Sequence, residues 1–256
     1  MNSRIVHALL SDLENPRAVV EELWVFRHWV VARTDRFAVV SIPNATTRHL
    51  CCGNSDISGW RGRPVSEVIK EGLSSPEVVL RAAAMACLNG SLRMAPSGFE
   101  GNAVSPFSER VKHEKSCFIG HFEEGARWRE AGYPVTIVEL EPREKDIHWK
   151  DADDALGQAS LVFITGLTLL NDTFSQVVER TPNAVTRVLM GPTVPPSARF
   201  LDFGVHVIGG TVVENPALLL RYFQYGGTSI KKAPSGAVSR FNIVDPTRKL
   251  EASFVV

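Results

Sequence analysis

Hydrophobic positions in the second half of the chain come in short runs separated by stretches with helical spacing. The runs are Ser116–Ile119, Val135–Leu140, Leu161–Thr165, Thr186–Met190 and Val205–Ile208. Each is apolar and β-branched, as expected for parallel strands that are buried on both faces. Helical segments are predicted between them near Glu123–Ala131, Thr173–Arg180, Ser197–Phe203 and Pro216–Tyr225. This alternation favours right-handed crossovers and an α/β fold with a doubly wound parallel sheet.

The first ninety or so residues follow a different pattern, which predicts a smaller α+β unit. Apolar residues at helical spacing over Ile5–Leu13 indicate a helix. Two strands are expected at Leu23–Arg33 and Phe37–Ile42, joined by a hairpin turn. Helices over Pro64–Glu71 and Pro76–Asn89 complete the unit.

Residues 91–113 contain scattered Ser, Pro, Gly and Asn with little periodicity, which indicates a domain boundary. The predicted organisation is a small α+β domain at 1–95, a linker at 96–113, a Rossmann-like domain at 114–232 and a C-terminal extension at 233–256. The alternative interpretation of the middle segment is a functional loop that reaches from one domain into the other. The sequence leaves open whether the extension is a strand or a tail.

Charge and cysteine usage narrow the class of protein. Lys and Arg number 28 and Asp and Glu number 28, so there is no basic surplus to bind nucleic acid. The apolar runs are too short to span a bilayer, and the first residues lack an apolar signal core. Cys51, Cys52, Cys87 and Cys117 show no spacing typical of a disulfide framework. We therefore expect a reduced, cytoplasmic protein without a membrane or nucleic-acid partner.

Glycine followed closely by threonine recurs after three of the predicted strands. The segments are Gly166-Leu167-Thr168, Gly191-Pro192-Thr193 and Gly209-Gly210-Thr211, with Asn171 and Thr173 after the first. The carboxyl ends of strands in an open parallel sheet converge on a crevice where such folds bind ligands. Glycine lets the backbone come close to a ligand, threonine offers a hydroxyl, and helix amino ends favour an anion. In the simpler interpretation, the glycines make tight turns and the threonines or Asn171 cap helices.

The end of the first predicted strand carries Gly120 and His121. The further glycines of a dinucleotide fingerprint are absent, which argues against NAD or FAD bound in the usual way. Glu139 follows Gly120 by about twenty residues, where an acid often holds ribose hydroxyls, so a cofactor like S-adenosylmethionine is an alternative. A solvated Glu139 is the simpler interpretation. His121 is a candidate acid, base or metal ligand, although a lone histidine is more often structural.

A second candidate for metal chemistry lies in the first half, at His49-Leu50-Cys51-Cys52. Soft metals favour imidazole and thiolate ligands. Adjacent cysteines, however, lack the usual chelate spacing of zinc sites. A metal carrier or sensor that uses His49, Cys51 and Cys52 is therefore a third hypothesis.

The ordered motifs of the second half resemble a known family. They are Gly166-x-Thr168-Leu169-x-Asn171-x-Thr173, Gly191-Pro192-Thr193, Asp202-Phe203-Gly204-Val205, Gly209-Gly210-Thr211-Val212-Val213 and Gly226-Gly227, with Phe118-Ile119-Gly120 and Val138-Glu139 before them. The pattern resembles the putative heavy-metal chelation family of the DUF364 type, over roughly Leu10 to Lys232. The first half looks like its companion of the DUF4213 type, a small domain similar to the enolase amino-terminal fold.

The resemblance implies a Rossmann-like domain that faces the smaller one across a cleft, and the handling of a transition metal or a metal complex. Carried over to this chain, the ligand-binding residues would be Gly120, Glu139, Gly166, Thr168, Asn171, Thr173, Gly191, Pro192, Thr193, Gly209 and Thr211. The leading hypothesis is a small anionic or metal-chelating ligand in the cleft between the domains. Catalysis on that ligand and assembly into a homodimer are left open.

Overall fold

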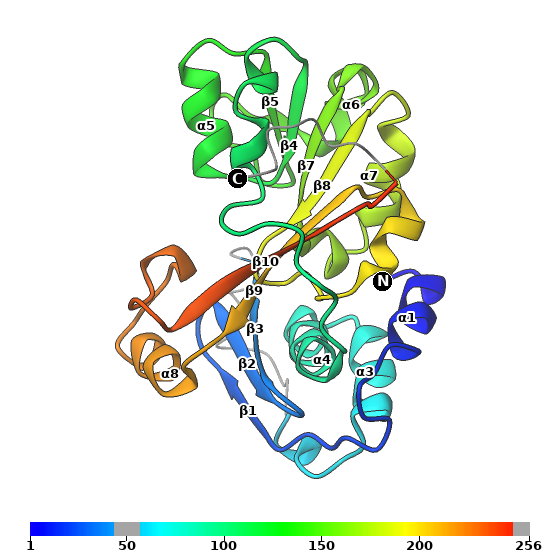
Figure 1. Cartoon of the computed structure of the whole chain (residues 1–256), viewed down its shortest axis with the longest axis vertical. Helices are drawn as coiled ribbons and strands as arrows, with labels where there is room; N and C mark the ends of the chain where they lie inside the picture. The colour runs from blue at the N-terminus through cyan, green and yellow to red at the C-terminus, as the bar shows by residue number, and fades with distance from the viewer. Residues whose placement is uncertain (44–56, 248–256) are drawn as a thin grey trace.

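The computed structural model of the chain describes residues 1–43 and 57–247. The molecule has two parts, drawn at the bottom and top of Figure 1, each built on its own sheet. A three-stranded antiparallel sheet forms the N-terminal part, and a seven-stranded, mostly parallel sheet forms the C-terminal part. This is the expected combination of a smaller α+β unit with a doubly wound α/β unit.

The N-terminal sheet has three strands in chain order. They are β1 (Glu22–Val25), β2 (Trp29–Arg33) and β3 (Phe37–Ser41). The prediction of one strand over Leu23–Arg33 was wrong, because the chain reverses at Phe26, whose amide donates to the Trp29 carbonyl at 2.7 Å. No Gly, Pro, Asn or Asp marks this reversal in the sequence. The helices of this part are α1 (Ser3–Leu10), α3 (Val65–Leu73) and α4 (Val78–Ser91), with a 3-10 turn η2 (Ser58–Trp60).

The seven-stranded sheet has the order β10-β9-β8-β7-β4-β5-β6. Its strands are β4 (Ser116–Ile119), β5 (Val135–Glu139), β6 (Ile147–His148), β7 (Leu161–Thr165), β8 (Thr186–Met190), β9 (Val207–Val213) and β10 (Val238–Val244). β10 pairs antiparallel with β9, and the other pairs are parallel. The strand order reverses between β4 and β7, which in such sheets is where ligands usually bind.

Helices cover both faces of this sheet (Figure 1). The α-helices on these faces are α5 (Glu123–Glu130), α6 (Asp153–Gln158) and α7 (Phe174–Arg180), whereas α8 (Pro216–Gln224) packs on the N-terminal sheet. The 3-10 turns of this part are η3 (Ser105–Phe107), η4 (Arg110–Lys112), η5 (Trp149–Asp151), η6 (Gly166–Leu169), η7 (Ala198–Phe203) and η8 (Ile230–Lys232). The predicted helix over Ser197–Phe203 is thus a 3-10 helix. No helix in residues 1–43 and 57–247 has both the length and the apolar character needed to cross a membrane.

Alternating residues of β4 serve the two faces of the sheet, as a strand requires. Phe118 faces the α5 side, where it stacks on Phe163 at 4.4 Å between ring centroids and meets Trp128. Cys117 and Ile119 belong to the core on the opposite side. That opposite core continues without interruption into the core of the N-terminal part, so the two parts pack as one body.

The segment between the two parts is packed against the larger sheet. Val104, Phe107 and Val111 are buried in the core on the α5 side. Asn242 of β10 fixes the segment, because its side-chain amide donates to the carbonyls of Phe99 and Gly101 at 3.1 Å each. Residues 96–113 therefore form part of the wall of the C-terminal part.

The β9–β10 hairpin joins the two parts and corrects one prediction. Gly209-Gly210-Thr211 is not a loop after a strand but lies inside β9, paired with residues 240–242 of β10. The two glycines allow close packing, since a Cβ on Gly210 would lie 2.2 Å from the Phe241 ring. Residues 238–244, whose state the sequence left open, form β10. α8, which lies between β9 and β10 in the chain, packs on the N-terminal sheet. There the Phe223 ring stacks on the Trp29 ring, with 5.2 Å between the ring centroids.

The Phe118–Phe163 stack yields a test of this packing. We expect Phe118→Ala to lower the free energy of unfolding by about 3–5 kcal/mol, because a fully buried aromatic ring is lost and a cavity remains. Urea denaturation monitored by circular dichroism measures the change. Leu140→Ala, at a side chain that is 46% exposed, is the control and should cost about 0.5 kcal/mol or less. A similar small loss for Phe118→Ala would contradict the packing described.

Candidate functional site

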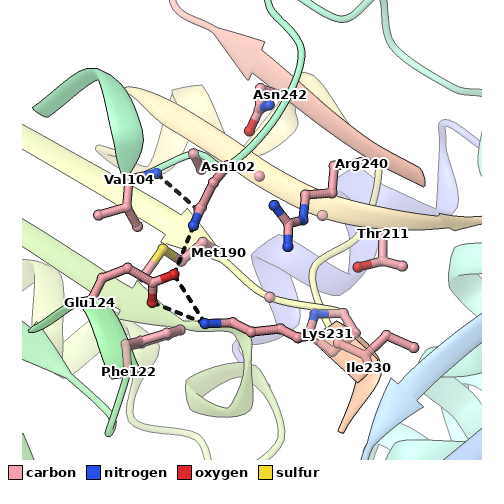
Figure 2. A pocket seen from close by; sticks show the side chains of 15 residues that line it. Asn102, Val104, Phe122, Glu124, Met190, Thr211, Ile230, Lys231, Arg240 and Asn242 are labelled. Carbon is pink, nitrogen blue, oxygen red and sulfur yellow. Dashed lines mark hydrogen bonds and ion pairs between the residues drawn. The ribbon is translucent and has the colours of Figure 1, made fainter. Parts of the chain in front are cut away.

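A cavity of about 120 Å³ opens at the carboxyl end of β8, beside the middle of β9, and we call it the Arg240 cavity (Figure 2). Its polar side chains are those of Asn102, Glu124, Thr211, Lys231, Arg240 and Asn242. Apolar side chains and glycine backbone complete the wall, notably Val104, Phe122, Met190, Ile230, Gly191 and Gly210. The cavity therefore combines a few charged groups with a mainly apolar lining, as small-molecule sites usually do.

An ion pair forms one side of the Arg240 cavity. The ammonium group of Lys231 lies 3.0 Å from Glu124 Oε1, and the Asn102 side-chain amide donates to the same oxygen at 2.9 Å (Figure 2). Burial alone would raise the pKa of Glu124, but the hydrogen bonds from Lys231, a backbone amide and Asn102, together with the charge of Lys231, hold that pKa below its usual value. Glu124 is therefore ionised at neutral pH, and its charge is already matched by Lys231.

Arg240 supplies a second cation, and it is unmatched. Its side chain extends from β10 into the middle of the cavity, between Thr211 and Asn242 (Figure 2). Within residues 1–43 and 57–247, its guanidinium group makes no hydrogen bond or ion pair. Arginine presents a planar set of donors that suits a carboxylate or phosphate, so the cavity is prepared for an anion.

Close backbone packing holds the cavity wall in place. A Cβ on Gly209 would lie 2.5 Å from Ala103 Cβ and 2.9 Å from Asn242 Oδ1, so only glycine lets β9 approach this wall. Gly191 has φ +121°, and its amide donates to the Gly209 carbonyl at 3.0 Å. Four predicted site residues thereby line the cavity, namely Gly191, Pro192, Gly209 and Thr211.

A second group of titratable residues lies at the carboxyl ends of β4 and β5. The His121 amide donates to Glu139 Oε1 at 2.7 Å, and His121 Nδ1 lies 3.6 Å from Asp146 Oδ2. Burial raises the pKa of Glu139, although the backbone amides of His121 and Leu140 oppose that rise. The structure thus brings His121, Glu139 and Gly120 together, close to where Phe122 begins the cavity wall.

The predicted residues Thr168, Asn171 and Thr173 make hydrogen bonds within the fold and lie outside the lining of the Arg240 cavity. Thr168 is buried, and its hydroxyl donates to the Thr165 carbonyl at 2.7 Å. Asn171 Oδ1 accepts from the amide and the hydroxyl of Thr173, which is the simpler interpretation of that motif. The hydroxyl hydrogens of Thr168 and Thr173 and the Oδ1 atom of Asn171 are thus engaged in hydrogen bonds within the fold.

Thr193 lies where the two parts of the molecule meet, and Gly166 packs beside it. The Thr193 hydroxyl contacts the Ser41 hydroxyl at 2.8 Å, and its carbonyl accepts from the Asn89 side chain at 3.2 Å. A Cβ on Gly166 would lie 2.8 Å from Val194. Thr193 thus joins the two parts, whereas Gly166 allows close packing within the C-terminal part. The proposed metal ligands His49, Cys51 and Cys52 lie outside the described residues.

A cavity of about 260 Å³ lies between the two parts, and we call it the interdomain cavity. Phe37, Asn89 and Met94 line it from one side, and Pro196 and Val212 from the other. Its charged groups already have partners, since Arg36 contacts Glu14 and the Leu92 carbonyl, and Glu214 accepts from Ser239. Thr211 lines both cavities.

Sequence reasoning missed the charged residues of the Arg240 cavity. Lys231 and Arg240 follow the last predicted helix, in a stretch without a clear assignment. The signal was the apolar spacing of Phe241 and Ile243, which would have indicated a strand. Glu124 lies within a predicted helix, and its position there did not indicate a place in the cavity.

The raised pKa of Glu139 predicts a stability that depends on pH. The folded state holds a proton on Glu139 more tightly than the unfolded chain, whose usual value is 4.5, so folding stability falls as pH rises above that value. In Glu139→Gln the side-chain oxygen can still accept from the His121 amide, but the side chain does not titrate. The variant therefore does not lose folding stability in this way as the pH rises. We expect the variant to be more stable than the wild type at about pH 7 and to lose that advantage near pH 4. Urea denaturation at both pH values, with the exposed Glu141→Gln as control, tests this; equal stability at pH 7 would contradict it.

Comparison with known proteins places the chain in a family. The model of the DUF364 family, described as putative heavy-metal chelation, matches residues 102–242, so the resemblance extends beyond Lys232 into β10. A DUF364 protein of unknown function from Desulfitobacterium hafniense has a similar structure, with a TM-score of 0.79 and 19% identity over 94% of this chain and 98% of that one. Another from Pyrococcus horikoshii has a TM-score of 0.69 and 16% identity over 95% and 99%. An uncharacterized protein of Methanocaldococcus jannaschii is 36% identical over 76 residues, which span 29% of each chain. Because the family model matches more than half of the chain, this protein belongs to the DUF364 family.

Proposed function

We propose that the protein binds a small anionic ligand, or a metal ion held by an anionic chelator, with the charged end of the ligand in the Arg240 cavity. The observation that carries the proposal is the unmatched guanidinium of Arg240, which projects into the cavity beside Lys231 (Figure 2). A carboxylate there would gain charge-assisted hydrogen bonds from Arg240. The Thr211 hydroxyl lies beside it as a further polar contact.

The donor groups of the cavity favour a complexed metal over a bare ion. Among residues 1–43 and 57–247, no three His, Cys, Asp or Glu side chains come together in a group that could hold a metal. Glu124, the acid of the cavity, is occupied by Lys231 and Asn102. A metal cargo would therefore arrive with its own ligands and be recognised through their negative charge.

The proposal shifts the expected position of the ligand. The sequence suggested a cleft between the two parts, but Arg36, the cation among the described residues that line the interdomain cavity, is already bound to Glu14 and the Leu92 carbonyl, whereas Arg240 has no such partner in the described part of the chain. Thr211 belongs to both, so a larger ligand anchored at Arg240 would have its remainder near the junction. We also infer, from the resemblance, that residues 1–95 are an enolase amino-terminal-like companion; a three-stranded sheet backed by helices supports this.

The alternative of a nucleoside cofactor is less well supported. Glu139 Oε1, expected to hold ribose, already accepts from the His121 amide. The first turn of α5, where a phosphate would bind, carries Glu123 and Glu124. Negative side chains at a helix start occupy the position that an anion would take.

Calorimetric titration with citrate tests the proposed site, because citrate is both a tricarboxylate and a metal chelator. We expect Arg240→Met and Lys231→Met each to weaken binding of citrate, alone or as its nickel complex, by roughly 10- to 100-fold, since each removes a charged hydrogen-bond donor. Arg221→Gln, on α8 outside the cavity, is the matched control and should leave the affinity unchanged. Binding that is absent in the wild type, or insensitive to both cavity variants, would contradict the proposal.

A further inference from the structure

His121 is held in a fixed position at the carboxyl end of β4, beside the reversal in strand order. Its amide donates to Glu139 Oε1 at 2.7 Å. The preceding Gly120 has φ +105°, and its amide donates to the Val138 carbonyl at 3.0 Å. A side chain at Gly120 would be strained and would lie 2.9 Å from Thr165, so the turn that presents His121 depends on this glycine.

The two ring nitrogens of His121 have different surroundings. Nδ1 is closed off from solvent and makes no hydrogen bond within the described part of the chain. Asp146 Oδ2 lies 3.6 Å from this nitrogen. The side chain as a whole is still 18% exposed, so the open part is the rest of the ring, which includes Nε2.

Asp146 is a buried and firmly held carboxylate. Its side chain has no exposed surface, and it accepts from Arg129 Nη1 at 2.8 Å and from the Arg143 amide at 3.1 Å. Burial would raise its pKa, but the hydrogen bonds from Arg129 and Arg143 hold the pKa of Asp146 below its usual value. An ionised carboxylate therefore faces Nδ1. Glu139 adds a second negative charge, and Arg129 a positive one.

We propose that His121 and Asp146 form a proton-transfer pair at this edge of the sheet, in which Asp146 accepts a hydrogen bond from Nδ1–H and Nε2 receives a proton from a bound molecule. The donor is an O–H or N–H group of that molecule. The O–H or N–H bond breaks, its electron pair stays on the oxygen or nitrogen, and the proton forms an Nε2–H bond. Asp146 and Glu139 then stabilise the imidazolium. Asp146 is a positioning residue, because it acts through the tautomer of His121.

The geometry suits this role even though 3.6 Å exceeds hydrogen-bond length. Catalytic hydrogen bonds are often long in structures without ligand and shorten when one binds. Hydroxyl and amine groups of chelators lose protons when they take up a metal, so such molecules are a suitable class of partner. The pair does not depend on the proposed anion site at Arg240, and it can be tested without any ligand.

Nitrogen NMR of histidine-labelled protein tests the pair directly. At about pH 9, where imidazoles are neutral, we expect His121 to carry its hydrogen on Nδ1. Asp146→Asn should convert it to the Nε2–H form, since an asparagine amide donates where the carboxylate accepted. Glu139→Gln is the matched control and should leave the tautomer unchanged. An Nε2–H tautomer in the wild type would overturn the proposal, whether or not the variant folds.

Reaction with diethyl pyrocarbonate, which acylates an unprotonated imidazole nitrogen, gives a second measurement. Peptide mass spectrometry compares the rate at His121 with the rates at His7 and His113, whose side chains are exposed. We expect His121 to react through Nε2 in the wild type and on the order of tenfold more slowly in Asp146→Asn, with His7 and His113 unchanged. Equal rates at His121 in both proteins would overturn the proposal.

Discussion

The close approach of β9 to β10 at Gly209 and Gly210 is the constraint on which both the cavity and the union of the two parts depend. A Cβ on Gly210 would lie 2.2 Å from the Phe241 ring, and one on Gly209 would lie 2.5 Å from Ala103. Because neither position has room for a side chain, the wall segment can lie against β9, and Asn242 can hold it there. Arg240 then projects from the neighbouring strand into the space that this wall encloses (Figure 2).

The same hairpin continues from the large sheet to the small one, as the orange and red strands of Figure 1 show. α8, which lies between its two strands in the chain, covers the face of the N-terminal sheet opposite α4. The loop after β8 adds polar contacts, in which Thr193 meets Ser41 and Arg199 pairs with Asp12 at 2.8 Å. The residues directly after β8 therefore have two roles. Gly191 and Pro192 line the cavity, and Thr193 makes hydrogen bonds between the two parts.

Charge is distributed unevenly along the carboxyl edge of the large sheet. At β9 and β10 the unmatched group is the cation Arg240. At β4 and β5 the groups are His121 and the carboxylates Glu139 and Asp146. An anion is thus favoured at one end of the edge, and a proton or a cationic group at the other.

The sequence by itself determined the architecture of the C-terminal part. β4, β7 and β8 have the predicted bounds, because strands buried on both faces must be continuously apolar and β-branched. Local pattern could also show where glycine and threonine cluster, and four of those residues line the cavity. The same pattern could not distinguish a glycine that approaches a ligand from one that admits a neighbouring strand, so Gly209 and Gly210 were assigned to a loop. The identity of the charged groups was decided by tertiary structure alone. Glu124 is 107 residues away from Lys231 in the chain, and it meets Lys231 and Arg240 because β10 pairs with β9 and η8 folds back toward α5. Contacts of that kind depend on long-range packing, which no local spacing of residues encodes.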